Sequence, residues 1–490
     1  MKSLLNHLQH LTQSEALALV ELWMIRFILL GLLLYVGALA QTPSAATLLQ
    51  AGLNAQSTQE YWRAESFFQQ AAILAPTDFR PPLDVGRLHL LERKDDLAES
   101  ELQAALALQH DNADIWLALG QLAQVEGHLN VAEQDWLQAT HFAPTAAANQ
   151  AQQQLGLLYE KQKRFAQAEA HFARIASSDA LATYHLGALR LERGDLSGAR
   201  QAFQATLAQR TQAALHAPAR LFLEAIAQWD NSAASWRQIG LDYLQNDLAP
   251  LAEAPLRQAL ALAPGDALAQ ASLAWAEFQQ GEMDQARTTI QQALTLEPGN
   301  SFANFVLSQI ALADGYYQTA SDALDRALGS DPQNPVLWAA RAQLADQLHD
   351  PAFAQTAYQH AAQFAKGDPQ FDLLLVSYYL RRGLALTSDA LQSAEEATRL
   401  APTNGQAFDL LGQVQQARSQ LDSALTSYER ASLLDPTDAA IHLHLGQLQA
   451  ALGDLRAAEL NLRKAVVLDT EGNILRQAQA ALQRLPPIGN

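Results

Sequence analysis

The stretch WRQIGLDYLQNDLAPLAEAPLRQALALAP, residues 236–264, decides the fold because small residues recur in it at fixed places. Trp236 and Gly240 lie in its first half, and Ala252, Ala259 and Pro264 lie in its second. Two helices can cross closely only where a small side chain faces the partner helix. The stretch therefore predicts a helical hairpin with Gly240 and Ala252 at the crossing.

The same arrangement recurs along the chain, mostly in steps of 34 residues. The place of Gly240 is taken in other units by Gly52, Gly86, Gly120, Gly156, Gly187, Ala274, Ser308, Ala342, Tyr378, Gly412 and Gly446. Alanine follows twelve places later in every unit, as at Ala132, Ala424 and Ala458. Proline closes seven units, because it removes a backbone donor and excludes the preceding residue from helical geometry. Tyr378 is too large for a close crossing, so we expect repeat ten to be splayed or out of register.

This pattern resembles the tetratricopeptide repeat (TPR), a helical hairpin of 34 residues. The resemblance covers about residues 45–472. It implies an all-α fold, a right-handed superhelical α-solenoid of about twelve TPR hairpins. In such a solenoid the first helix of each pair lines a concave groove that binds protein or peptide segments.

The repeats predict two blocks separated by a break. Block 1, residues 45–213, holds about five repeats, and block 2, residues 233–472, holds about seven. Residues 214–232 predict an irregular extra helix and a hinge, because the step from Gly187 to Gly240 is nineteen residues too long. Residues 473–490 predict a capping helix and tail, and residues 1–15 an N-terminal tail. Pro255 is expected to kink the second helix of its hairpin.

The composition narrows the classes of function. The chain has 490 residues, no cysteine and a formal net charge of −19, with 32 basic against 51 acidic residues. This balance argues against a nucleic-acid partner, since neutralising phosphates needs clustered Lys and Arg. Without Cys, disulfides, thiolate metal sites and thiol catalysis are excluded. No HExxH, P-loop, GxGxxG or GxSxG motif occurs, so we expect no enzyme, no catalytic residues, no cofactor and no metal.

Residues 16–40, ALALVELWMIRFILLGLLLYVGALA, predict a transmembrane helix, because about 20 apolar residues span a bilayer. The few basic residues before it favour a single-pass membrane protein with its TPR region outside the cytoplasm. Two alternatives stay open at this point. Ala38-Leu39-Ala40 fits a signal-peptidase site, so cleavage at Ala40 would leave a secreted or periplasmic protein. The segment could also be an apolar helix of a cytosolic protein.

The resemblance also implies which residues face the groove. One cluster of inward places is rich in apolar side chains: Leu241, Leu244, Trp275, Phe278, Phe302, Phe305, Gln309 and Leu312. If exposed, they form a partner-binding patch; if repeats seven and eight are rotated, they belong to the core. We expect a membrane-anchored scaffold that binds protein partners without catalysis. The alternative is an accessory factor in the assembly or export of cell-surface polysaccharide or envelope proteins, which only fold-level analogy supports.

Overall fold

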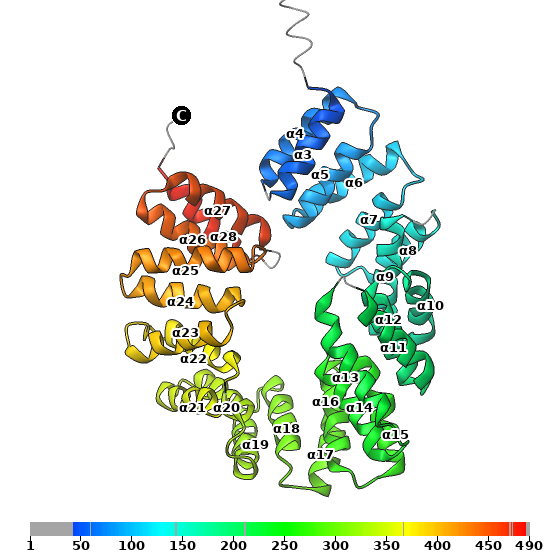
Figure 1. Cartoon of the computed structure of the whole chain (residues 1–490), viewed down its shortest axis with the longest axis vertical. Helices are drawn as coiled ribbons and strands as arrows, with labels where there is room; N and C mark the ends of the chain where they lie inside the picture. Colours follow the sequence, from blue (N-terminus) through cyan, green and yellow to red (C-terminus); the bar gives the residue numbers. More distant parts are fainter. Residues whose placement is uncertain are drawn as a thin grey trace, which may run out of the picture.

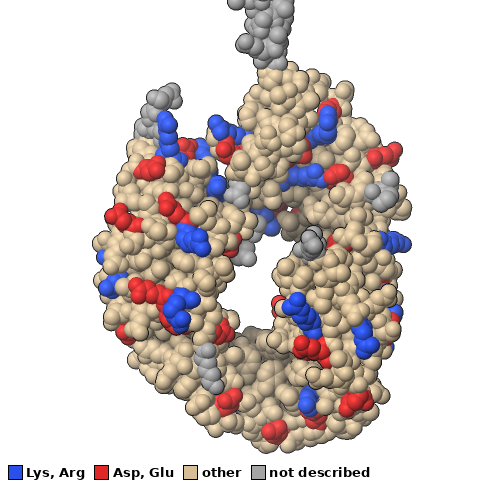
Figure 2. Space-filling view, in the orientation of Figure 1, with Lys and Arg blue, Asp and Glu red and all other residues tan. Residues whose placement is uncertain are grey.

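The computed structural model describes residues 43–486, except residues 59, 143–144, 210–211, 366, 470–471 and 473. In these residues we find 26 α-helices, one short 3-10 helix and no strand. The predicted all-α class is confirmed. The helices follow one another as hairpins that surround a central opening (Figure 1), and the space-filling view shows the same opening (Figure 2).

Five hairpins lie before residue 210. They are α3 (Ala45–Ser57) with α4 (Tyr61–Leu74), α5 (Arg80–Leu91) with α6 (Asp95–Leu108), α7 (Ala113–Val125) with α8 (Leu129–Thr140), α9 (Ala146–Lys161) with α10 (Phe165–Ile175), and α11 (Ala180–Glu192) with α12 (Leu196–Ala208). Next come η1 (Ala213–Leu215) and the single helix α13 (His216–Ala227).

Seven further hairpins follow. They are α14 (Ala233–Gln245) with α15 (Ala249–Leu262), α16 (Ala267–Gln279) with α17 (Met283–Leu296), α18 (Ser301–Ala313) with α19 (Tyr317–Ser330), α20 (Pro335–Gln347) with α21 (Pro351–Phe364), α22 (Pro369–Arg381) with α23 (Ser388–Leu400), α24 (Gly405–Ala417) with α25 (Leu421–Leu434), and α26 (Ala439–Leu452) with α27 (Leu455–Leu468). The last helix, α28 (Leu475–Arg484), packs on α27. Helix α15 runs through Pro255 without a break.

In the turns between hairpins, a proline after one helix is followed by a polar residue that caps the next helix. Helix α15 ends at Leu262, Pro264 follows two places later, and Asp266 accepts a hydrogen bond from the backbone N–H of Ala269. Pro298 and Asn300 repeat this arrangement before α18. A capping side chain satisfies a backbone donor that the first turn of a helix leaves free. The same few residues therefore end one hairpin and begin the next.

In all hairpins but one, the crossing joins a small residue to a large one sixteen places later. A Cβ added to Gly120 would lie 2.5 Å from Trp136 Cδ1, and one added to Gly412 would lie 2.6 Å from Tyr428 Cε1. Trp136 and Tyr428 are buried, so each ring fills the space that its glycine leaves. The residues predicted to pack the repeats and found buried are Gly120, Ala132, Gly240, Ala252, Ala259, Gly412, Ala424, Gly446 and Ala458.

Repeat ten reverses the two sizes. Tyr378 is fully buried in α22, and the residue sixteen places later is Ala394, also fully buried. The Tyr378 ring lies 5.0 Å from the Tyr358 ring of the preceding hairpin, and its hydroxyl donates to the Pro351 carbonyl at 2.6 Å. Helices α22 and α23 pack together, but less extensively than the two helices of the other hairpins, in agreement with the expected splaying. The small Ala394 leaves room for the large Tyr378.

The break between the two blocks is packed rather than open. Phe222 of α13 is buried and stacks on Phe203 of α12 at 5.0 Å, and it lies 5.3 Å from Tyr243 of α14. One apolar cluster runs from Ala113 to Ala276, through the extra helix. The hinge expected at residues 214–232 is therefore filled by side chains. Trp236 belongs to this packing: it is half-buried and its ring meets Trp229 edge-on at 4.6 Å.

The two ends of the solenoid meet. The Arg463 guanidinium of α27 lies 5.4 Å from the centre of the Trp62 ring of α4. Figure 1 shows the first and last hairpins at the same end of the molecule, on the two sides of the opening. The hairpins thus form a nearly closed ring.

The predicted single-pass membrane protein is wrong by this structure. Residues 16–40 and the alternative cleavage site at Ala40 lie outside the described residues. Within residues 43–486 and apart from the gaps given above, no helix is both long and apolar enough to cross a bilayer. The longest of them, α9, has 16 residues, about 24 Å, whereas the hydrocarbon core measures about 30 Å.

Candidate partner-binding surface

Four aromatic side chains form a continuous row on α16 and α18. The ring of Trp275 lies 5.3 Å from Phe278 and 5.8 Å from Phe305, centre to centre, and Phe302 lies 6.3 Å from Phe305. Residues three apart share one side of a helix, and α16 packs against α18, so the four rings meet. We call Trp275, Phe278, Phe302 and Phe305 the aromatic row.

The aromatic row is neither fully buried nor fully exposed. Each of its rings is partly exposed, and each packs against the buried core of repeats seven and eight. In Figure 1, α16 and α18 border the central opening. The face shown in Figure 2 carries acidic and basic residues in scattered positions, without a basic patch. The row thus offers partly exposed apolar surface on two helices that border the opening, with no field that favours an anionic partner.

The other residues predicted for the groove differ in exposure. Leu241, Gln309 and Leu312 are partly exposed, and Leu312 packs beside Phe305. The Gln309 amide donates to Ser308 Oγ at 3.3 Å. Leu244 is 8% exposed and belongs to the core that crosses the junction. Leu244 is therefore not available to a partner in this conformation.

A second concave region lies where the first block meets the second. It is a pocket of about 790 Å³, lined among others by Glu160, Lys163, His185, Pro250 and Glu282. Glu160 and His185 are buried and 2.8 Å apart. Lys163 forms ion pairs with Glu253 and, at 2.7 Å, with Glu282. Burial lowers the pKa of Lys163, but the two ion pairs raise it more, so its ammonium stays charged at neutral pH.

None of these pocket residues is among those predicted from the sequence. The pocket joins repeat four to repeats six and seven, and the Lys163 pairs link residues 90 and 119 places apart. A periodic pattern describes only contacts between neighbouring repeats. The one local signal is the irregular step between Gly187 and Gly240, which shows that the repeat is interrupted there.

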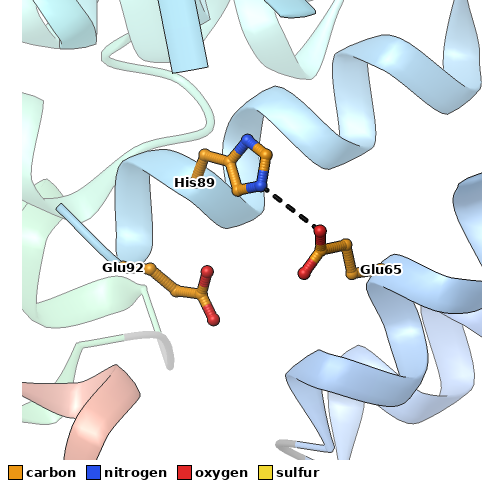
Figure 3. Close-up of side chains that lie close together, drawn as sticks. All are labelled: Glu65, His89 and Glu92. Atoms are coloured by element: carbon orange, nitrogen blue, oxygen red, sulfur yellow. Dashed lines mark ion pairs between the residues drawn. The ribbon is translucent and has the colours of Figure 1, made fainter. Parts of the chain in front are cut away.

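One group of possible metal ligands was also not predicted from the sequence. Glu65, His89 and Glu92 bring one ligand atom each to within 4.8 Å of one another (Figure 3). His89 and Glu92 lie three places apart, a spacing that brings side chains together on a helix. Glu65 comes from the preceding helix, so the sequence alone does not place it beside them.

Comparison with known proteins agrees with the repeat. Family models described as tetratricopeptide repeat match residues 154–214, 237–301 and 272–335, and a model described as TPR repeat matches residues 412–453. Among curated protein sequences, none matches the chain.

Several solved structures are similar to the chain. PilF of Pseudomonas aeruginosa is 21% identical with a TM-score of 0.38, covering 45% of this chain and 97% of PilF. YrrB, a TPR protein with an unusual peptide-binding site, is 20% identical with a TM-score of 0.32, covering 39% and 96%. Yeast Tom70 is 15% identical with a TM-score of 0.39, covering 90% and 95%. At these TM-scores the likenesses carry no argument about partners.

The stacked hairpins place the chain in the class of helical-repeat solenoids, in which neighbouring repeats build one continuous core. Within that class, the crossing pattern and the matched family models define the repeats as tetratricopeptide repeats. The chain thus contains TPR repeats in residues 154–214, 237–335 and 412–453, and TPR repeats are in general protein-interaction scaffolds. The TPR fold is typically not catalytic.

Proposed function

We propose that this protein is a scaffold that binds a protein partner through the aromatic row. The observation that carries the proposal is the partial exposure of four adjoining rings on α16 and α18. Large aromatic side chains dominate binding energy at protein interfaces, because each buries much apolar area with little loss of conformational freedom. Their packing against the core holds the rings in place before a partner arrives.

The occupant that fits is a segment of a partner protein that carries apolar side chains. Such a segment would bury its apolar side chains against Trp275 and Phe305 in the middle of the row. Gln309 is partly exposed nearby and can both donate to and accept from a peptide backbone. The net charge of −19 disfavours an acidic segment.

Two steps test the proposal. A photo-crosslinking amino acid at Phe305 should capture the partner in the cells that produce this protein, and mass spectrometry should identify it. The double variant Trp275→Ala, Phe305→Ala should then weaken binding of that partner by at least about tenfold, the equivalent of about 1.4 kcal/mol. Isothermal titration calorimetry with the purified partner measures this loss.

The matched control is Tyr316→Ala, Tyr317→Ala, which removes two exposed aromatic rings outside the row. The control should bind as wild type does, and both double variants should unfold cooperatively. Equal binding by the two variants would refute the proposal. A large fall in unfolding temperature confined to Trp275→Ala, Phe305→Ala would place those rings in the core instead.

A further inference from the structure

Three ligand-bearing side chains meet between the first two hairpins, away from the aromatic row. Glu65 projects from α4, His89 from α5, and Glu92 from the residue that ends α5. Helices α4 and α5 pack against each other, so the three side chains are held by two neighbouring hairpins. In Figure 3 the imidazole and the two carboxylates turn toward the same space.

The spacing of the three side chains suits a shared ion better than a direct hydrogen bond. His89 Nε2 lies 3.5 Å from Glu65 Oε1. Good N–H···O hydrogen bonds are about 2.7–3.2 Å long, so this contact is weak. A tetrahedral ion with bonds of about 2.1 Å holds its ligand atoms about 3.4 Å apart. All three ligand atoms lie within 4.8 Å of one another, so small rotamer changes would bring them onto one ion.

The protonation chemistry of His89 permits binding. Its side chain is buried, with 5% of the residue exposed, and its Nδ1 has no hydrogen-bond partner among the described residues. In the neutral ring, a proton on Nδ1 leaves Nε2 free to offer its lone pair to an ion. One imidazole and two carboxylates form a donor set that Zn²⁺ accepts, and their two negative charges balance its charge.

Lys94 is the competing cation. Its ammonium lies 2.5 Å from Glu92 Oε2. The Lys94 side chain is 46% exposed, whereas that of Glu92 is only 12% exposed. The ammonium can therefore turn into solvent and leave Glu92 to a divalent ion.

We propose that Glu65, His89 and Glu92 bind one Zn²⁺ ion, which links the first hairpin to the second. Three protein ligands leave the fourth tetrahedral position to water. The chain has no cysteine, so no thiolate competes for the ion.

The test is calorimetric titration of the purified full chain with zinc chloride. Wild type should bind one ion, and Glu65→Gln and His89→Gln should each bind at least about tenfold more weakly, since even residues behind the ligands contribute that much. Glu99→Gln is the matched control, because it removes the same charge from an exposed position on α6. Lys94→Gln should bind the ion more tightly than wild type.

Thermal unfolding without zinc checks that each variant folds. If His89→Gln does not fold, the test of the zinc site rests on Glu65→Gln, which should fold because the Glu65 carboxylate is partly exposed. Titration with Co²⁺ should give a visible absorption band in wild type that Glu65→Gln loses. Failure of wild type to bind Zn²⁺, or equal affinities of Glu65→Gln and Glu99→Gln, would overturn the proposal. Neither result would affect partner binding at the aromatic row.

Discussion

Single residues set the closeness of the helices in this solenoid. Gly120 shows this most directly, because the Trp136 ring occupies the place where a Cβ would stand. Gly329 of α19 has no such role, because a Cβ added there would meet no atom within 4 Å. Two helical glycines of one chain can thus have opposite effects on stability.

We predict that Gly120→Ala destabilises the protein by about 1–3 kcal/mol, because the added methyl overpacks the crossing. Gly329→Ala should stabilise it by about 0.5–1 kcal/mol, because alanine loses less backbone entropy in a helix. Urea unfolding followed by circular dichroism measures both. Shifts of the same sign in the two variants would contradict the crossing geometry.

A buried acid should make stability depend on pH. Asp242 of α14 is 1% exposed; it accepts from Gln238 Nε2 at 2.8 Å, and its Oδ2 has no hydrogen-bond partner among the described residues. Burial raises the pKa of Asp242 to about 6. The unfolded chain releases this proton near pH 3.9, so the folded state binds more protons between about pH 4 and 6. Stability must therefore fall as pH rises through that window.

Asp242→Asn should remove the loss of stability that ionisation of Asp242 causes. The variant should therefore be more stable than wild type at pH 8 by about 2 kcal/mol. At pH 4 the two proteins should differ little. Burial also raises the pKa of Asp84, Asp135 and Asp372 to about 6, but both proteins share those residues. Parallel curves of unfolding free energy against pH would contradict the assignment.

At the scale of the element, the hairpin is the unit in which sizes must match. In most hairpins the small residue is on the first helix and the large one on the second, as in Gly412 with Tyr428. Hairpin α22–α23 has the reverse order, Tyr378 with Ala394. Its two helices pack less extensively than those of the other hairpins, which agrees with the splaying expected from Tyr378, although Ala394 leaves room for the ring.

This exchange predicts coupling between the two residues. Tyr378→Gly alone should cost about 3–5 kcal/mol by leaving a cavity. Ala394→Tyr alone should also destabilise, because two rings would then compete for one space. The double variant restores the order of the other hairpins, so its loss should be smaller than the sum by at least about 1 kcal/mol. Additive losses in urea unfolding would show that the two residues do not share this space.

At the scale of the whole molecule, contacts between distant repeats set the curvature. Lys163, in the turn of repeat four, pairs with Glu253 of α15 and with Glu282, the residue before α17. Arg463 and Trp62 close the other side of the ring. The partners of these contacts are far apart in sequence, so they join hairpins that do not follow one another.

Lys163→Glu should open the junction, because it replaces the cation between Glu253 and Glu282 with a third carboxylate. We expect a larger radius of gyration by small-angle X-ray scattering, most clearly at low salt, where charges are screened least. Lys161→Glu is the control: it makes the same charge change at an exposed neighbour that forms no ion pair with a described residue. Identical scattering from the two variants would mean that the ion pairs do not hold the junction.

Reasoning from the sequence alone determined the all-α class and the succession of helical hairpins with a TPR pattern. These features follow from patterns within one or two 34-residue units, where helix periodicity and proline place side chains reliably. Only the tertiary structure decided that Leu244 is buried while Trp275 and Phe305 stay partly exposed, that α13 fills the break, and that Glu65 lies beside His89. The physical reason is that exposure and clustering depend on how far each hairpin is rotated relative to its neighbours. The residues of a single repeat do not determine this rotation angle.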